Sequence, residues 1–163
     1  MNRRLADAAR ATPGVVVRDL YATYPDFYID VRREQALVAH AALLVFLHPV
    51  RWYAMPSLLK EWVDVVFEAG WAYGEHGNAL KDKDCLLAVT TGGTAAAYSQ
   101  DGVHGHDFAA FLPPYIQTAR LCGMRWQDPL VLHGAHHASE DEIAAHVRRF
   151  IALISRPLQK ETT

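Results

Sequence analysis

Runs of consecutive apolar residues mark the strands that the sequence predicts. Residues 43–47 are continuously apolar, and residues 85–90 are apolar up to a final threonine, which is typical of strands covered on both faces. Residues 15–20 are rich in β-branched side chains and read as another strand. Residues 131–133 belong to the last strand, so we expect strands at these places along the chain.

Helical patterns separate these strands. Residues 2–11 and 31–40 have helical composition. Pro56 opens a further helix, whose apolar side chains recur three and four positions apart: Leu58, Leu59, Trp62, Val63, Val66 and Phe67. A helix is predicted over residues 108–122, delayed or bent near its start by two prolines. Ser139 and Glu142 form a capping box for the final helix.

The alternation of strands and helices predicts an α/β fold, with a parallel sheet covered by helices on both faces. No repeat or linker interrupts the chain, so residues 1–163 are expected to form a single domain. Ligands of such sheets bind beyond the carboxyl ends of the strands. Two loops follow strands at that edge, residues 48–56 and 90–107, and we expect the functional site there.

Composition and charge argue against several classes of function. The net charge is −2, and the basic residues are scattered, unlike those of a nucleic-acid groove. The longest apolar run, residues 41–47, is too short to cross a bilayer, and the N-terminus lacks the apolar core of a signal peptide. Cys85 and Cys122 have neither metal-type nor redox-type spacing. Two buried free thiols are typical of a cytoplasmic protein, which is what we expect.

The first loop carries an aromatic pair, Trp52 and Tyr53, between Pro49 and Pro56. An aromatic pair at the edge of a sheet suits a flat heteroaromatic ligand, which stacks on a ring face or edge. Simple packing is the more frequent role of an aromatic loop, so this loop alone leaves both interpretations open.

The second loop begins with Thr90, Thr91, Gly92 and Gly93 directly after a predicted buried strand. Glycines at this place let a ligand approach the backbone, and they expose amide groups that stabilise negative charge. Tyr98 and His104 follow in a glycine-flanked stretch, and their side chains donate hydrogen bonds or protons near neutral pH. The ordinary alternative for a single loop histidine is a solvated side chain.

A group of histidines at the end of the last predicted strand and just after it raises the question of a metal site. His133, His136 and His137 lie close together in sequence, but no carboxylate or cysteine completes a convincing set of ligands. We therefore expect a polar loop before the final helix, and no metal.

Several sequence motifs occur together in a fixed order: His48-Pro49-x-x-Trp52-Tyr53-x-x-Pro56, then Leu58-Leu59-Lys60-x-Trp62, Trp71-Ala72-Tyr73 and Thr90-Thr91-Gly92-Gly93. With them, residues 42–123 resemble the NAD(P)H:quinone oxidoreductase family of the DT-diaphorase type. They also resemble the ancillary oxidoreductases of glutathione-gated potassium-efflux systems. The resemblance implies a flavodoxin-like three-layer sandwich with FAD or FMN as cofactor.

For function, the resemblance implies that NAD(P)H gives hydride to the flavin, which passes two electrons to a quinone or a similar acceptor. Pro49, Val50, Arg51, Trp52 and Tyr53 would hold the isoalloxazine ring, together with Thr90, Thr91, Gly92 and Gly93. Tyr98 and His104 would act as the catalytic pair that manages the charge and proton of the reduced flavin. Tyr73 would line the substrate pocket of a neighbouring subunit, which implies a homodimer. The alternative is a regulatory ancillary subunit with a cation-efflux membrane protein as partner.

The chain departs from this resemblance at its beginning. Relatives start with a buried strand and a phosphate-binding loop, whereas this sequence starts at or inside the first helix. We therefore expect the first strand to be missing from the sheet, so that residues 15–20 lack their neighbour and an edge is exposed. Weak flavin binding is the expected consequence. Asn2 is a candidate remnant of the phosphate loop.

Overall fold

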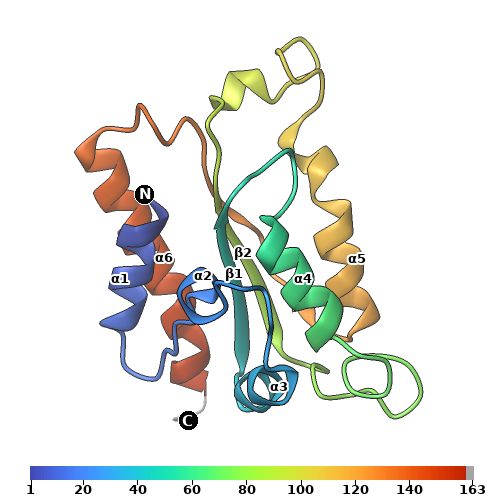
Figure 1. The fold of residues 1–163 in the computed structure, drawn as a ribbon. Coiled ribbons are helices and arrows are strands. Elements are labelled where there is room, and N and C mark those ends of the chain that lie inside the picture. The colour runs from blue at the N-terminus through green and yellow to red at the C-terminus, as the bar shows by residue number, and fades with distance from the viewer. Residues whose placement is uncertain (161–163) are drawn as a thin grey trace.

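A parallel sheet forms the centre of the computed structural model, which describes residues 1–160, the last five of them as helix backbone only (Figure 1). Its strands are β1 (Leu43–Pro49), β2 (Asp84–Thr90), β3 (Arg125–Trp126) and β4 (Leu130–Leu132). β2 pairs with β1 on one side and with β3 and β4 on the other, and every pair is parallel. β3 pairs with the start of β2 and β4 with its end, so the two short strands share one position in the sheet.

Helices cover both faces of the sheet, as predicted. They are α1 (Asn2–Arg10), α2 (Leu20–Thr23), α3 (Val31–Ala39), α4 (Ser57–Val66), α5 (Pro113–Leu121) and α6 (Glu140–Lys160), with 3-10 turns η1 (Ala95–Ala97) and η2 (Phe108–Phe111). In Figure 1, α1 and α6 lie on one side of the sheet, and α3, α4 and α5 lie on the other. The α/β fold with a parallel sheet is therefore confirmed. None of the helices within residues 1–160 is both long and apolar enough to cross a membrane.

β2 is buried along its whole length, because it lies between the two helical layers. Leu86 and Ala88 pack in the cluster that includes α1 and α6. Cys85, Leu87 and Val89 pack in the cluster that includes α3, α4 and α5. Alternate residues of a strand point to opposite faces, so a strand with helices on both faces must be apolar throughout. This is the physical reason for the continuous apolar run.

Two helix starts follow their sequence signals. At α6, the Ser139 amide donates to the Glu142 carboxylate at 2.7 Å, and the Glu142 amide donates to the Ser139 hydroxyl at 3.3 Å, which is the expected capping box. The helix predicted over residues 108–122 is divided into η2 and α5, with Pro113 at the first turn of α5. Proline is tolerated there because the first turn leaves amides unpaired.

The strand predicted over residues 15–20 is wrong. Residues 15–19 belong to no strand of the described residues, and Leu20 begins α2. A cavity of about 1200 Å³ separates this segment from β1, bounded by Phe150 on one face of the sheet and Trp62 on the other. A strand needs a neighbour that satisfies its backbone groups, and none of residues 1–160 occupies the gap. The gap is where the resemblance places a first strand, and no strand within residues 1–160 pairs with β1 on that side.

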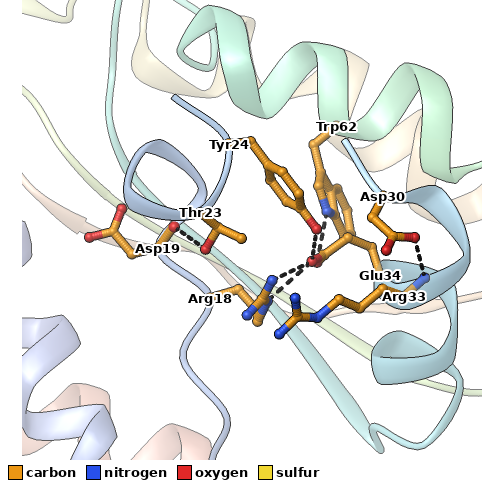
Figure 2. A network of polar contacts seen from close by, with 8 residues as sticks. All are labelled: Arg18, Asp19, Thr23, Tyr24, Asp30, Arg33, Glu34 and Trp62. Carbon is orange, nitrogen blue, oxygen red and sulfur yellow. Dashed lines mark hydrogen bonds and ion pairs between the residues drawn. The ribbon is translucent and has the colours of Figure 1, made fainter. Parts of the chain in front are cut away.

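A buried carboxylate ties residues 15–19 to the helices beside them (Figure 2). Glu34 of α3 is 1% exposed, and accepts hydrogen bonds from the Arg18 guanidinium at 2.6 Å, the Tyr24 hydroxyl at 2.7 Å and the Trp62 indole at 3.1 Å. Burial by itself raises the pKa of Glu34, but the three donors outweigh burial and hold the pKa below its usual value. The network keeps residues 15–19 in position without any β-ladder.

Candidate functional site

The loop after β1 remains attached to β2 at the carboxyl edge of the sheet. The Val50 amide donates to the Thr90 carbonyl at 2.8 Å, one residue beyond the end of β1. The chain then forms a tight turn, in which Arg51 and Ala54 exchange two hydrogen bonds of 2.9 and 3.0 Å. These contacts place the predicted aromatic pair directly beside the start of the second loop.

Trp52 and Tyr53 are the two central residues of this turn, and both have left-handed backbone conformations, with φ of 48° and 65°. Such turns normally carry Asn-Gly at these places, because bulky residues are strained there. Trp52 is 92% exposed, whereas the Tyr53 ring stacks on Phe111 with centroids 5.0 Å apart. The turn therefore holds one indole out into solvent at the edge of the sheet.

The second loop is fastened to the loop after β4 by backbone hydrogen bonds. The Thr91 amide donates to the Leu132 carbonyl at 3.0 Å, and the Ala135 amide donates to the Thr91 carbonyl at 2.9 Å. The Gly134 amide donates to the Gly93 carbonyl at 2.8 Å. Thr91 itself is buried. The carbonyls of Thr91 and Gly93 are thus both directed at the loop after β4.

The orientation of these carbonyls determines where the neighbouring amides point. In a trans peptide the carbonyl and the following N–H point in opposite directions. The amides of Gly92 and Thr94 therefore point away from the loop after β4, and neither has a hydrogen-bond partner within residues 1–160. Unpaired amides in a turn bind negative charge. The Gly93 amide, which the sequence predicted together with that of Gly92, also has no hydrogen-bond partner within residues 1–160.

Gly93 lies against the predicted tyrosine and histidine. A Cβ on Gly93 would come within 2.9 Å of His104 Nε2 and 3.3 Å of the Tyr98 ring, whereas a Cβ on Gly92 would meet only His136, at 3.8 Å. The rings of Tyr98 and His104 are 4.3 Å apart between centroids. The close packing of this pair, more than the approach of a ligand, explains why position 93 is a glycine.

The tyrosine and histidine also reach the aromatic turn. The Tyr53 hydroxyl lies 3.4 Å from His104 Nδ1, so the two loops meet through their side chains. Burial raises the pKa of Tyr98 above its usual value, and the nearby Tyr53 raises it further. Tyr98 therefore keeps its proton at neutral pH and is a hydrogen-bond donor. The structure thus brings together the residues that the sequence placed in separate loops.

Two further residues at this edge were not assigned to the site from sequence. Asn2, named only as a candidate remnant, donates from its side chain to the Thr90 hydroxyl at 3.1 Å, and its Oδ1 is buried without a partner within the described residues. His133 contacts Thr91, with Nδ1 3.0 Å from Oγ1. His133 follows β4, so its position after a parallel strand was the signal that could have identified it.

Tyr73 lies away from the two loops of the candidate site. It belongs to the loop between α4 and β2, and this loop lies at the opposite end of the sheet from the aromatic turn (Figure 1). α4 starts at the carboxyl edge and runs back, so the segment that follows it must lie at the amino edge. Within one chain Tyr73 is not part of the site, and its role toward a second subunit stays a prediction.

The edge of the sheet fits a flat ring system that carries negative charge. A pocket of about 700 Å³ opens beside the turn and is lined by Pro49, Trp52 and Met55 together with the cationic side chains of Arg51 and Lys60. Aromatic and apolar walls with a few convergent polar groups are typical of cofactor sites. Neither this pocket nor the larger cavity along β1 is lined by residues 91–94, Tyr98 or His104. The aromatic turn beside the smaller pocket is the part of the first loop that contacts His104, through the Tyr53 hydroxyl. We therefore place the candidate site at the two loops.

Comparison with known proteins gives matches over nearly the whole chain. A family model described as "Flavodoxin-like fold" matches residues 1–154. The potassium-efflux ancillary protein KefF of Enterobacter sp. (strain 638) is 41% identical over 149 residues, covering 91% of this chain and 84% of KefF. General stress protein 14 of Bacillus subtilis (strain 168) is 38% identical over 157 residues, covering 96% of this chain and 90% of that protein.

A solved structure gives a ligand-bound comparison. General stress protein 14 of Treponema denticola, in complex with FMN, superposes with a TM-score of 0.88 at 36% identity, and the match covers 95% of this chain and 89% of that one. An NADPH-quinone reductase from P. pentosaceus superposes with a TM-score of 0.79 at 21% identity, which is a similarity of fold alone.

Proposed function

Because the chain belongs to the family with the flavodoxin-like fold, we propose that it binds FMN at the carboxyl edge of its sheet and is an NAD(P)H-dependent oxidoreductase that passes two electrons to a quinone-like acceptor. The convergence of Tyr53, Tyr98 and His104 on the turn with unpaired Gly92 and Thr94 amides carries this proposal. The FMN complex of the 36% identical Treponema protein supports FMN over FAD.

In this proposal the two loops bind the ring of FMN from two directions. Pro49, Val50 and Arg51 provide backbone next to the ring, while Trp52 and Tyr53 provide aromatic surface. Residues 90–93 provide the opposing loop, and the amides of Gly92 and Thr94 donate to the electron-rich edge. When bound, FMN supplies the two-electron hydride chemistry that protein side chains lack.

The tyrosine and histidine hold protons beside that edge. The protonated Tyr98 hydroxyl is a donor, because burial raises its pKa. His104 contacts both the Tyr53 hydroxyl and Gly93, so it lies where charge develops on a ligand bound by the turn. Donors placed in advance at such a position stabilise the charge without reorganisation.

The remaining parts of the proposal concern the oligomeric state of the protein and its location in the cell. Residues 1–163 would act as one flavin-binding domain in a homodimer, in which Tyr73 serves the pocket of the partner. The two free cysteines, both buried, are consistent with a reducing cytoplasm. A strictly monomeric protein with full quinone reductase activity would contradict the role of Tyr73, and light scattering during turnover measures this.

Titration of the purified protein with FMN and with FAD tests the cofactor, and absorbance at the flavin band reports binding. We expect FMN to bind more tightly. NADH or NADPH should reduce the bound flavin once without an acceptor, and continued oxidation of NADH or NADPH should require a quinone that takes up the electrons in turn. Absence of binding for both flavins would refute the proposal. Binding without electron transfer to any quinone or related acceptor would refute only its enzymatic part.

A second candidate function is supported by the match to KefF. KefF is, by name, an ancillary protein of a glutathione-regulated potassium-efflux system, so this chain would regulate a cation-efflux membrane protein. Membrane vesicles that contain such an efflux protein, assayed for potassium release with and without this chain, test the alternative. Stimulation of release by a Tyr98→Phe variant that lacks reductase activity would favour regulation as the main function.

A further inference from the structure

His133 lies directly behind the turn that presents the two amides. It follows β4, and its Nδ1 is 3.0 Å from the Thr91 hydroxyl oxygen. The same Thr91 hydroxyl is 2.7 Å from the Gly93 carbonyl oxygen. The Gly93 carbonyl also accepts the Gly134 amide at 2.8 Å. His133, Thr91 and Gly93 therefore form a short chain of hydrogen bonds.

Which group donates in each of these hydrogen bonds follows from the number of protons that the groups carry. A carbonyl oxygen only accepts, so the Thr91 hydroxyl must donate to Gly93. A hydroxyl has one proton, so toward His133 the same oxygen can only accept. The proton of this hydrogen bond must then be on Nδ1 of His133. In the neutral imidazole this leaves Nε2 without a proton.

The ring of His133 is held on its other sides by aromatic groups. Tyr98 lies 5.4 Å away between centroids, and Phe108 meets the ring edge-on at 5.3 Å. Burial lowers the pKa of His133 below its usual value, which favours the neutral ring. Tyr98 also contacts His104, so the same tyrosine ring links His133 to the proposed catalytic pair.

We propose that His133 is a positioning residue of this site, which holds the Thr91–Gly93 turn through a single tautomer with its proton on Nδ1. Because the Thr91 hydroxyl accepts a hydrogen bond from His133, it donates its own proton to the hydrogen bond with the Gly93 carbonyl. That carbonyl stays directed at the loop after β4, and the Thr94 amide stays directed at the ligand. The tautomer follows from the structure alone, whereas the ligand that it serves rests on the proposed function.

The tautomer can be measured without any flavin. Nitrogen-15 NMR of the imidazole distinguishes a protonated Nδ1 from a protonated Nε2. We expect His133 to carry its proton on Nδ1 in the unmodified protein and in Thr91→Ser, which keeps the hydroxyl. Thr91→Val removes the acceptor at nearly constant shape, so the proton should no longer be confined to Nδ1. A proton on Nε2 in the unmodified protein would overturn the proposal.

The effect on binding is measured with FMN as the probe. His133→Phe keeps an aromatic ring against Tyr98 and Phe108 but loses the donor, and should weaken FMN binding about tenfold, the effect of one lost hydrogen bond in a partly buried site. His133→Asn places an amide donor near the position of Nδ1 and should recover most of that loss. Equal FMN affinity in His133→Phe and the unmodified protein, or no recovery in His133→Asn, would overturn the positioning role.

Two controls separate the outcomes. Urea midpoints of both variants must stay near that of the unmodified protein, so that weaker binding is not a consequence of unfolding. If the unmodified protein binds no FMN, the proposed function fails. The NMR measurement still decides the direction of the hydrogen bonds in that case. Faster hydrogen exchange in His133→Phe at the Gly134 amide, which donates to the Gly93 carbonyl, would support the positioning role, whereas unchanged exchange would contradict it.

Discussion

Replacing Trp52 with asparagine should make this protein more stable, although tryptophan is the larger and more apolar residue. Trp52 has a φ of 48° and a side chain that is 92% exposed. A non-glycine residue in the left-handed region costs about 1–2 kcal/mol, and asparagine tolerates that region better than other residues. Little burial is lost with the exposed indole. We therefore expect the free energy of unfolding to rise by about 1 kcal/mol.

Urea unfolding measures this change as a higher midpoint with an unchanged slope, and thermal unfolding should shift by about 2–4 °C for a chain of this size. Trp52→Phe is the matched control, because it keeps the aromatic character and the strained backbone. Its stability should equal that of the unmodified protein. A Trp52→Asn variant no more stable than Trp52→Phe would refute the strain argument.

The same substitution tests why the strain is retained. If Trp52 provides aromatic surface for FMN, as proposed, Trp52→Asn should weaken FMN binding while it stabilises the free protein. Residues held in costly backbone conformations are frequent at functional sites for this reason. Unchanged FMN affinity in Trp52→Asn would show that the indole has no role in cofactor binding and would leave the strained backbone at this position unexplained.

Further predictions concern the packing of the site, a buried charge and a helix cap. Gly93→Ala should displace His104, whose Nε2 would lie 2.9 Å from the new Cβ, and should slow reduction by NAD(P)H at least tenfold in stopped-flow measurements, whereas Gly92→Ala should have little effect. Glu34→Gln should make the free energy of unfolding less dependent on pH in the acid range. Because the hydrogen bonds to Glu34 outweigh burial and lower its pKa, its carboxylate stabilises the fold above the usual value of 4.5, and that stabilisation is lost as the pH falls through the lowered pKa. Urea midpoints measured between about pH 3 and pH 7 should therefore fall less steeply for Glu34→Gln than for the unmodified protein, and parallel curves would contradict this. Ser139→Ala should cost about 1 kcal/mol of unfolding free energy, and Ser139→Thr should cost less.

The elements with strong local signals could be predicted from sequence. The capping box at Ser139, the continuous apolar run of β2 and the proline at the start of α5 each act through a few neighbouring residues. The edge of the sheet at which we propose the site could also be predicted from sequence, because parallel strands joined by helices all end at one edge. The two loops were therefore identified before their contacts were known.

The tertiary structure alone decided the features that depend on distant partners. Residues 15–19 have a β-branched sequence, but a strand exists only beside another strand, and here a cavity lies next to them. The proposed role of His133 depends on a hydroxyl 42 positions earlier in the chain, and the turn at Trp52 takes a conformation that its side chain disfavours. Local preferences act over a few residues, whereas hydrogen bonds and packing between remote segments form only when the whole sheet brings them together.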